Sequence, residues 1–291
     1  MLDCAHTYTP CMSLIRAIME QSMELDELDQ KIKTMPQLPS VVMELIDAVN
    51  KELTDLATLE EIISKDPVLS AKVLSIANSP FYGLGGQVSN IGHACMVLGF
   101  HTIKNIVTAV GAMSTLDKSQ INRLDLVAQW QRSMNTAVAS KIIAKKLSLD
   151  QDGAFVAALL HDIGELVLDI YYPEKFEEAL EMADKQQCTQ FEAEETILGF
   201  DHAIVGSRLA TYWNLPKLIV NAIEYHHRPN VSEASDLAAV IFVAEGMVKQ
   251  LPVESLPVEI MNKIKLKPEE LEESLPEITE AIKATTETVS V

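Results

Sequence analysis

The stretch AALLHDIGELVL, Ala157 to Leu168, carries an apolar helical pattern that runs into an adjacent histidine and aspartate and then a glycine. Burying His161 and Asp162 among apolar residues costs free energy unless partners satisfy both side chains. Two kinds of partner would do so. One is a metal ion, which indicates a hydrolase. The other is a set of protein groups in a pocket that has lost its metal.

The segments on both sides show helical periodicity together with helical start and stop signals. Thr58 to Glu61 (TLEE) predicts a capping box, and Asp66-Pro67 predicts an N-cap followed by proline in the first turn. Gly99 is placed as a helix stop. No alternating, β-branched runs bounded by tight turns are present. The sequence therefore predicts an all-α fold built from many helices.

Changes in composition divide the chain into three parts. We predict a helical extension over residues 1–30, a main domain over 31–250 and an acidic tail over 251–291, which has nine Glu and four Lys. Within the main domain we expect an N-terminal helical lobe over 31–123 and a second lobe over 124–250. Because prolines interrupt the tail, we predict that it is short, solvated and peripheral.

Charge and cysteine usage narrow the classes of partner. The 291 residues carry a formal net charge of −19, which disfavours nucleic acid and an anionic membrane surface as partners. The four cysteines form no CxxC pair, so neither a zinc knuckle nor a redox motif is visible. No segment reaches the roughly 18 apolar residues of a membrane span. We predict a soluble cytoplasmic protein.

Further histidines share the pattern seen at His161. His202 lies on one helical face with Val205 and Leu209, and His226 shares a face with the apolar residues of its own helix. His227 is about 100° further round. Imidazole and carboxylate ligands hold Fe, Mn or Zn in hydrolases. The alternative is a group of polar core residues that satisfy one another and the backbone.

Several segments resemble one protein family. LLHDIGELVL is similar to the signature of the HD superfamily of metal-dependent phosphohydrolases, and GFDHAIVGSRLATYWNLPKLIVNAIEYHHRP resembles the next segment of its HD-GYP and HDOD branches. MPQLPSVVMELIDAVN, LEEIISKDPVLSAKVLSIANSPFYG and NIGHACMVLGFHTIKNIV resemble the N-terminal half that is specific to HDOD, the HD-related output domain. The similarity spans residues 31–249 and implies an HD-like domain with that N-terminal lobe.

The resemblance also implies a set of site residues. HD enzymes hold metal with a first histidine, the HD pair and a later aspartate, where this chain has Arg132, the pair, and Glu245. The candidate residual metal site is His161, Asp162, His202, His226 and His227, with Glu245 as a further possibility. Arginine offers no lone pair to a metal. We therefore predict that Arg132 fills the place of the lost ion, within hydrogen-bonding distance of Asp162 or Glu245.

These observations favour a non-catalytic HDOD module that acts through protein–protein interaction in bacterial signal transduction. No catalytic residues and no cofactor are expected, and the partners are signalling proteins that the sequence does not identify. One alternative is a metal-dependent phosphohydrolase, an HD-GYP-like phosphodiesterase using Fe, Mn or Zn. Another is a pocket that senses phosphate or a nucleotide through Arg132 and the histidines.

Overall fold

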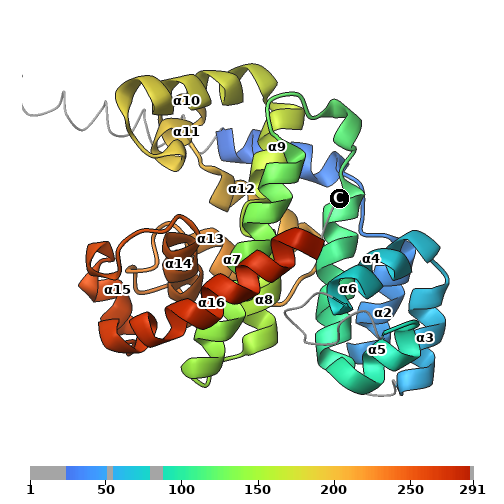
Figure 1. Cartoon of the computed structure of the whole chain (residues 1–291). Helices are drawn as coiled ribbons and strands as arrows, with labels where there is room; N and C mark the ends of the chain where they lie inside the picture. Colours follow the sequence, from blue (N-terminus) through green and yellow to red (C-terminus); the bar gives the residue numbers. More distant parts are fainter. Residues whose placement is uncertain (1–23, 51–54, 79–87, 289–291) are drawn as a thin grey trace, which may run out of the picture.

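The computed structural model describes residues 24–50, 55–78 and 88–288, and every regular element in these ranges is a helix (Figure 1). The predicted all-α, HD-like fold is thus confirmed. Most of the predicted extension, residues 1–23, lies outside the described residues. Among the described helices none is long and apolar enough to cross a membrane.

The helices over residues 40–115 gather on one side of the molecule, while the helix over residues 24–34 lies apart from them, with Lys31 near Tyr171 and Asp29 paired with Arg208 (Figure 1). A helix over residues 24–34 is followed by α2 (Ser40–Asn50), α3 (Leu56–Ser64), α4 (Pro67–Ala77), α5 (Ile91–Leu98) and α6 (Phe100–Thr115). Asp66 caps α4 by accepting hydrogen bonds from two backbone N–H groups, as predicted. The predicted capping box at Thr58 is wrong. Asp55 accepts the backbone N–H of Thr58, and this stronger upstream cap starts α3 one turn earlier.

The helices that carry the histidines follow in chain order. They are η2 (Lys118–Gln120), α7 (Leu126–Lys146), α8 (Gln151–Leu160), α9 (Ile163–Tyr171), α10 (Pro173–Gln186), α11 (Gln190–Leu198), α12 (His202–Tyr212), α13 (Lys217–Tyr225) and α14 (Asp236–Val248). The long helix α7 is central, because α8, α14 and the last helix of the chain all pack against it (Figure 1). Two of the helices that flank the HD pair and Glu245, α8 and α14, therefore pack on α7.

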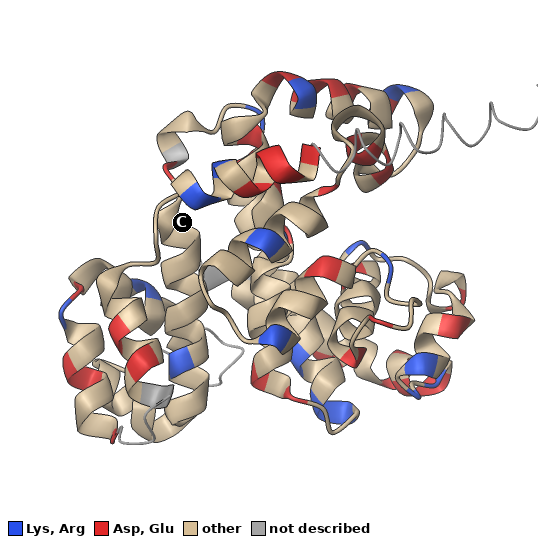
Figure 2. Ribbon diagram, turned by 180° about the vertical axis from the view of Figure 1, so that it is seen from behind, with Lys and Arg blue, Asp and Glu red and all other residues tan. Residues whose placement is uncertain are grey.

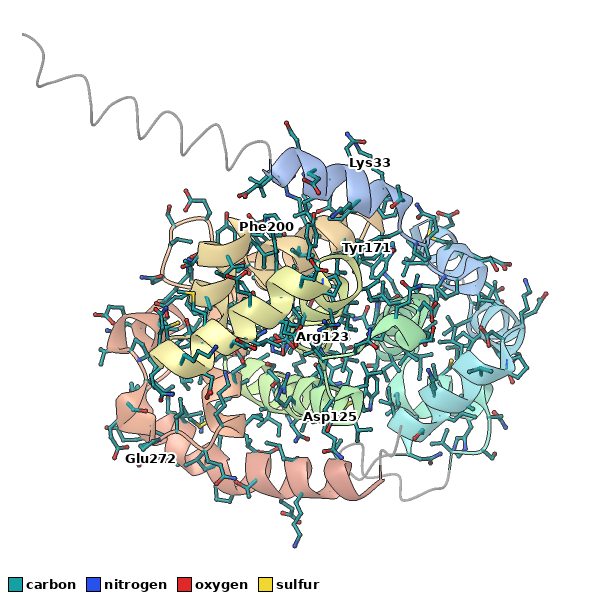
Figure 3. The ribbon with its side chains drawn as sticks, turned by 90° about the horizontal axis from the view of Figure 1, so that it is seen from above. Lys33, Arg123, Asp125, Tyr171, Phe200 and Glu272 are labelled. Carbon is teal, nitrogen blue, oxygen red and sulfur yellow. The ribbon has the colours of Figure 1, made fainter. Side chains whose placement is uncertain are left out.

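A buried carboxylate fixes the entry to α7. Asp169 is fully buried, and its Oδ2 accepts the backbone N–H groups of Asn122, Arg123 and Leu124 at 3.2, 2.9 and 3.0 Å. Arg123 and Asp125, the N-cap of α7, mark this loop in Figure 3. Hydrogen bonds from backbone N–H groups to a carboxylate are strong. They hold the start of α7 against α9.

The predicted peripheral tail packs against the rest of the protein instead. It forms η3 (Val253–Ser255), α15 (Val258–Lys263) and α16 (Pro268–Thr288), and α16 lies across α7 (Figure 1). Leu271 and Ile278 of α16 are buried, whereas Glu272 lies at the outer edge of the molecule (Figure 3). Pro252, Pro257 and Pro268 stand at the starts of these helices, where proline is accepted, and Pro276 lies inside α16 without ending it.

Candidate metal centre

The HD pair occupies the junction between α8 and α9. His161 is the C-cap of α8 and Asp162 is the N-cap of α9. Both are buried, with 1% and 7% of their surfaces exposed. The His161 Nδ1–H donates to the carbonyl of Ala158 at 2.6 Å. This bond leaves Nε2 to face the carboxylate of Asp162.

Three imidazoles converge on one carboxylate oxygen. The Nε2 atoms of His161, His202 and His226 lie 3.2, 3.6 and 3.8 Å from Oδ1 of Asp162. A carboxylate oxygen of Glu245, on α14, lies 3.8 Å from Nε2 of His161. The structure therefore brings together four residues of the predicted set, with Glu245 beside them. They come from the α8–α9 junction, the start of α12 and the end of α13.

The opposite ring nitrogens of His202 and His226 are held as well. The His226 Nδ1–H donates to the carbonyl of Ile223 at 2.7 Å, and the His202 Nδ1–H donates to Glu194 at 2.6 Å. Glu194 is fully buried. A histidine that ligates a metal usually donates its other N–H to a carbonyl or carboxylate in this manner, which fixes the tautomer. The imidazoles are therefore oriented as metal ligands are.

His226 supplies the clearest test of fit to a metal. Its Nε2 is buried and has no hydrogen-bond partner in the described part of the chain. Burial, together with the neighbouring His161, lowers the pKa of His226 to about 4. The ring is therefore neutral near pH 7, and a lone pair on Nε2 faces the pocket. An orphaned buried acceptor is costly, and a metal ion would satisfy it.

The remaining groups form a charge-rich shell. Burial lowers the pKa of His161, but the carboxylates of Asp162 and Glu245 outweigh it and leave this pKa raised. Burial likewise opposes ionisation of Glu245, yet the hydrogen bond and charge of His161 hold its pKa well below the usual range. The pocket thus attracts positive charge toward its two acidic groups.

His227 belongs to the outer edge of the cluster. Its Nε2 lies 2.7 Å from Nε2 of His202, and its ring stacks on Phe191 with centroids 4.5 Å apart. Burial and the neighbouring histidines hold the pKa of His227 well below its usual value. His202, His226 and His227 together form a second group whose nitrogens are close enough to share an ion.

Arg132 does not fill the place of an ion. Its Nη2 lies 3.3 Å from Oε2 of Glu165, and 48% of its side chain is exposed. The prediction that Arg132 points inward and pairs with Asp162 or Glu245 is therefore wrong. The side chain is half exposed, and it pairs with Glu165. The buried Gln129 of α7 does contact the HD pair, with its Nε2 3.3 Å from the Asp162 carbonyl and 3.0 Å from Glu165. Gln129 is one turn earlier on α7.

Two acidic residues near the HD pair, Glu165 and Glu194, were not predicted from the sequence. Glu165 accepts hydrogen bonds from Gln129, Arg132 and Gln190, and burial with the nearby Asp162 charge raises the pKa of Glu165 to about 7. Its spacing of three residues from Asp162 was an available signal. Glu194 gave no such signal, because only the packing of α11 on α12 buries it.

A cavity of about 550 Å³ opens over the histidines. Asp162, His202 and Glu245 line it, while Arg132 and Lys249 place two cations at its wall. Phe191 and Phe242 add aromatic surface, and the segment after α14 closes one side. The centre is thus accessible to a small molecule rather than sealed within the core.

Changing the inward residue of α7 provides a test of this geometry. We expect Gln129→His to raise the affinity for Mn²⁺ by about tenfold, because it adds an imidazole to the face that contacts the HD pair. Arg132→His is the matched control and should change the affinity little, since that side chain lies at the rim. Calorimetric titration of both variants checks the result. A larger gain for Arg132→His would place the missing ligand one turn later.

Comparisons with known proteins identify the family and similar folds. A family model described as the HDOD domain matches residues 35–229. The crystal structure of a "Putative phosphohydrolase" from Shewanella amazonensis SB2B is similar with a TM-score of 0.76 and 26% identity, covering 90% of this chain and 98% of that one. An HDOD domain protein with unknown function from Geobacter sulfurreducens gives a TM-score of 0.74 at 25% identity, covering 91% and 98%.

A curated relative is longer than this chain. An uncharacterized protein from Treponema pallidum is 26% identical over 249 residues, which is 82% of this chain and 48% of that protein. The chain thus spans about half the length of this relative.

Proposed function

Because the chain belongs to the HDOD family, we propose that it is a signalling module that binds partner proteins and keeps a metal-binding HD pocket without efficient hydrolysis. The interaction role follows from the family. The proposal that the pocket binds a metal but does not hydrolyse efficiently rests on the side chains around His161 and Asp162. The expectation of no cofactor was drawn from sequence, and the orphaned His226 Nε2 now favours a bound ion instead.

One observation carries the non-hydrolytic part of this proposal. The helix α7, which packs behind the HD motif, has no His, Asp, Glu or Cys in its 21 residues. Whichever turn of α7 faces the pocket, it offers no imidazole, carboxylate or thiolate to a metal. HD enzymes take their first metal ligand from this helix, according to the resemblance above. The set in this chain is therefore one ligand short.

The residues that would hold an ion are His161, Asp162, His202 and His226, with Glu245 in reach. Imidazole with carboxylate suits Fe, Mn or Zn. When bound, such a metal acts as a Lewis acid that lowers the pKa of a bound water. Ala158, Glu194 and Ile223 orient the three rings, and Arg132 and Lys249 attract anionic ligands toward the cavity.

A second candidate function is a metal-dependent phosphohydrolase. The convergence of three Nε2 atoms within 3.8 Å of one Asp162 oxygen favours it, as does the likeness to the Shewanella protein. Against it stand the missing ligand on α7 and the guanidinium at the rim, which repels a dication.

Hydrolysis by the metal-loaded protein separates the two candidates. We expect no Mn²⁺-dependent turnover of bis(p-nitrophenyl) phosphate or of a cyclic dinucleotide above that of a His161→Ala, Asp162→Ala variant. The assay compares initial rates of both proteins under saturating Mn²⁺. Turnover that the wild-type protein shows and the double variant lacks would favour the phosphohydrolase and reject the non-hydrolytic module.

A further inference from the structure

The segment over residues 251–288, here named the C-terminal segment, forms one wall of the metal pocket. Leu251, Ser255, Leu256 and Pro257 line the same cavity as Asp162, His202 and Glu245. The family match ends at residue 229, so this wall is built by residues beyond it. Access to the histidines therefore depends on where this segment lies.

A lysine attaches the C-terminal segment to the loop that carries two of the histidines. The loop over residues 226–235 joins α13 to α14 and begins with His226 and His227. The Lys263 ammonium group donates to the carbonyls of Val231 and Ala234 in this loop, at 3.0 and 2.7 Å. Charged hydrogen bonds of this kind are stronger than neutral ones. Lys263 thus joins the segment to the loop that positions His226.

The same segment also contacts the two helices beside the pocket. Leu256 packs on α14 at Gly246, where an added Cβ would lie 2.8 Å from a methyl group of Leu256. Gly246 directly follows Glu245. Farther along, α16 lies across α7, the helix that carries Gln129 and Arg132 (Figure 1). Two sides of the metal pocket, α14 and the loop after α13, are therefore in contact with this segment, which reaches α7 at Lys146.

Charge favours the docked position of α16. This helix is rich in Glu, whereas α7, which it covers, carries Arg and Lys but no Asp or Glu. Asp and Glu are otherwise spread over many helices (Figure 2), and the chain as a whole carries a net charge of −19. The opposite charges of α16 and α7 attract each other. The ion pair between Lys146 and Glu273 is largely exposed on its glutamate side, at 3.3 Å, so it contributes little. Apolar contacts and Lys263 carry the attachment.

We propose that the C-terminal segment is a regulatory cover whose docking is coupled to occupation of the metal centre. This inference rests on the proposed metal centre. A metal fixes His226 and its loop, and the docked segment fixes the same loop through Lys263. Each event therefore lowers the cost of the other, and the coupling is reciprocal. Release of the cover would open the cavity and expose the apolar face of α16.

Hydrogen exchange of the full-length chain tests the coupling, with Mn²⁺ alone as the probe. We expect Mn²⁺ to slow amide exchange across residues 251–288 by at least about fivefold. Lys263→Met, which alters no metal ligand, should speed exchange of the segment and weaken Mn²⁺ binding by at least about fivefold. The matched control, Lys267→Met, changes an exposed lysine of the same segment and should behave as the wild-type protein does.

The outcomes separate this inference from the proposal beneath it. Wild-type protein that binds no Mn²⁺ overturns both. Protein that binds Mn²⁺ while exchange of the segment stays unchanged overturns the cover and leaves the metal centre standing. If Lys263→Met does not fold, exchange of the wild-type chain with and without Mn²⁺ decides the question.

Discussion

Gly164→Ala is expected to destabilise the protein by about 2 kcal/mol, and to disrupt the metal centre with it. Gly164 lies where α9 crosses α12. A Cβ added there would overlap the backbone carbonyl of His202 and lie 2.9 Å from the backbone nitrogen of Gly206. Backbone atoms cannot turn aside as a side chain can. The helix α12 must therefore shift, and His202 at its start moves away from Asp162.

The size of this effect follows from two opposed contributions. Replacing glycine by alanine within a helix stabilises it by up to about 1 kcal/mol through propensity alone. Overpacking against a fixed backbone costs about 1–3 kcal/mol and sometimes more. Overpacking is expected to dominate, because the overlap involves two backbone groups of α12.

Urea denaturation measures this change, and Gly92→Ala is the matched control. The Cβ added at Gly92, in α5, would meet only the side-chain carboxylate of Glu60, which can rotate away. The control should be neutral or slightly stabilising. Wild-type stability and wild-type metal affinity in Gly164→Ala would show that the α9–α12 crossing does not set the position of His202.

The burial of the histidines could be predicted from helical spacing. His202 and His226 share faces with apolar residues, and both are buried, at 2% and 0% exposure. Their convergence on Asp162 could not be derived from spacing, since it depends on how α8, α12 and α13 cross. The family resemblance supplied that information. It also named α7 as the helix of the missing ligand, but the predicted pairing of Arg132 with Asp162 or Glu245 is wrong.

The error at Arg132 has a physical cause in α7. The buried face of this helix includes Gln129, Ser133, Thr136 and Ser140, so polarity does not mark the outward side. Periodicity of hydrophobic residues then gives no orientation. Arg132 and Gln129 lie three residues apart on adjacent turns, and only packing distinguishes the one that faces Asp162.

The C-terminal segment was mispredicted for a related reason. Its glutamates dominate the composition, while the buried residues described in α16 are few and widely spaced: Leu271, Ser274, Ile278 and Thr285. A narrow apolar stripe of this kind can be stabilised only by the surface that it covers. That surface is α7, which lies more than a hundred residues earlier in the chain.

His226→Leu should lower the affinity for Mn²⁺ or Zn²⁺ by about 100-fold or more, while lowering the stability of the metal-free protein by no more than about 1 kcal/mol. Leucine removes an Nε2 that has no partner in the described structure, and the one hydrogen bond lost is that from Nδ1 to the Ile223 carbonyl. A merely structural histidine would behave in the opposite way, because its removal would lower stability without affecting a metal.

The measurement is equilibrium dialysis of chelator-treated protein against Mn²⁺ or Zn²⁺, with bound metal determined by elemental analysis. His101→Leu, which changes an exposed histidine far from the centre in sequence, is the control and should bind as the wild type does. The account predicts about one tightly bound ion per wild-type chain and its loss in His226→Leu. Wild-type protein that binds no ion, or a His226→Leu variant that binds it equally well, would contradict the metal centre described here.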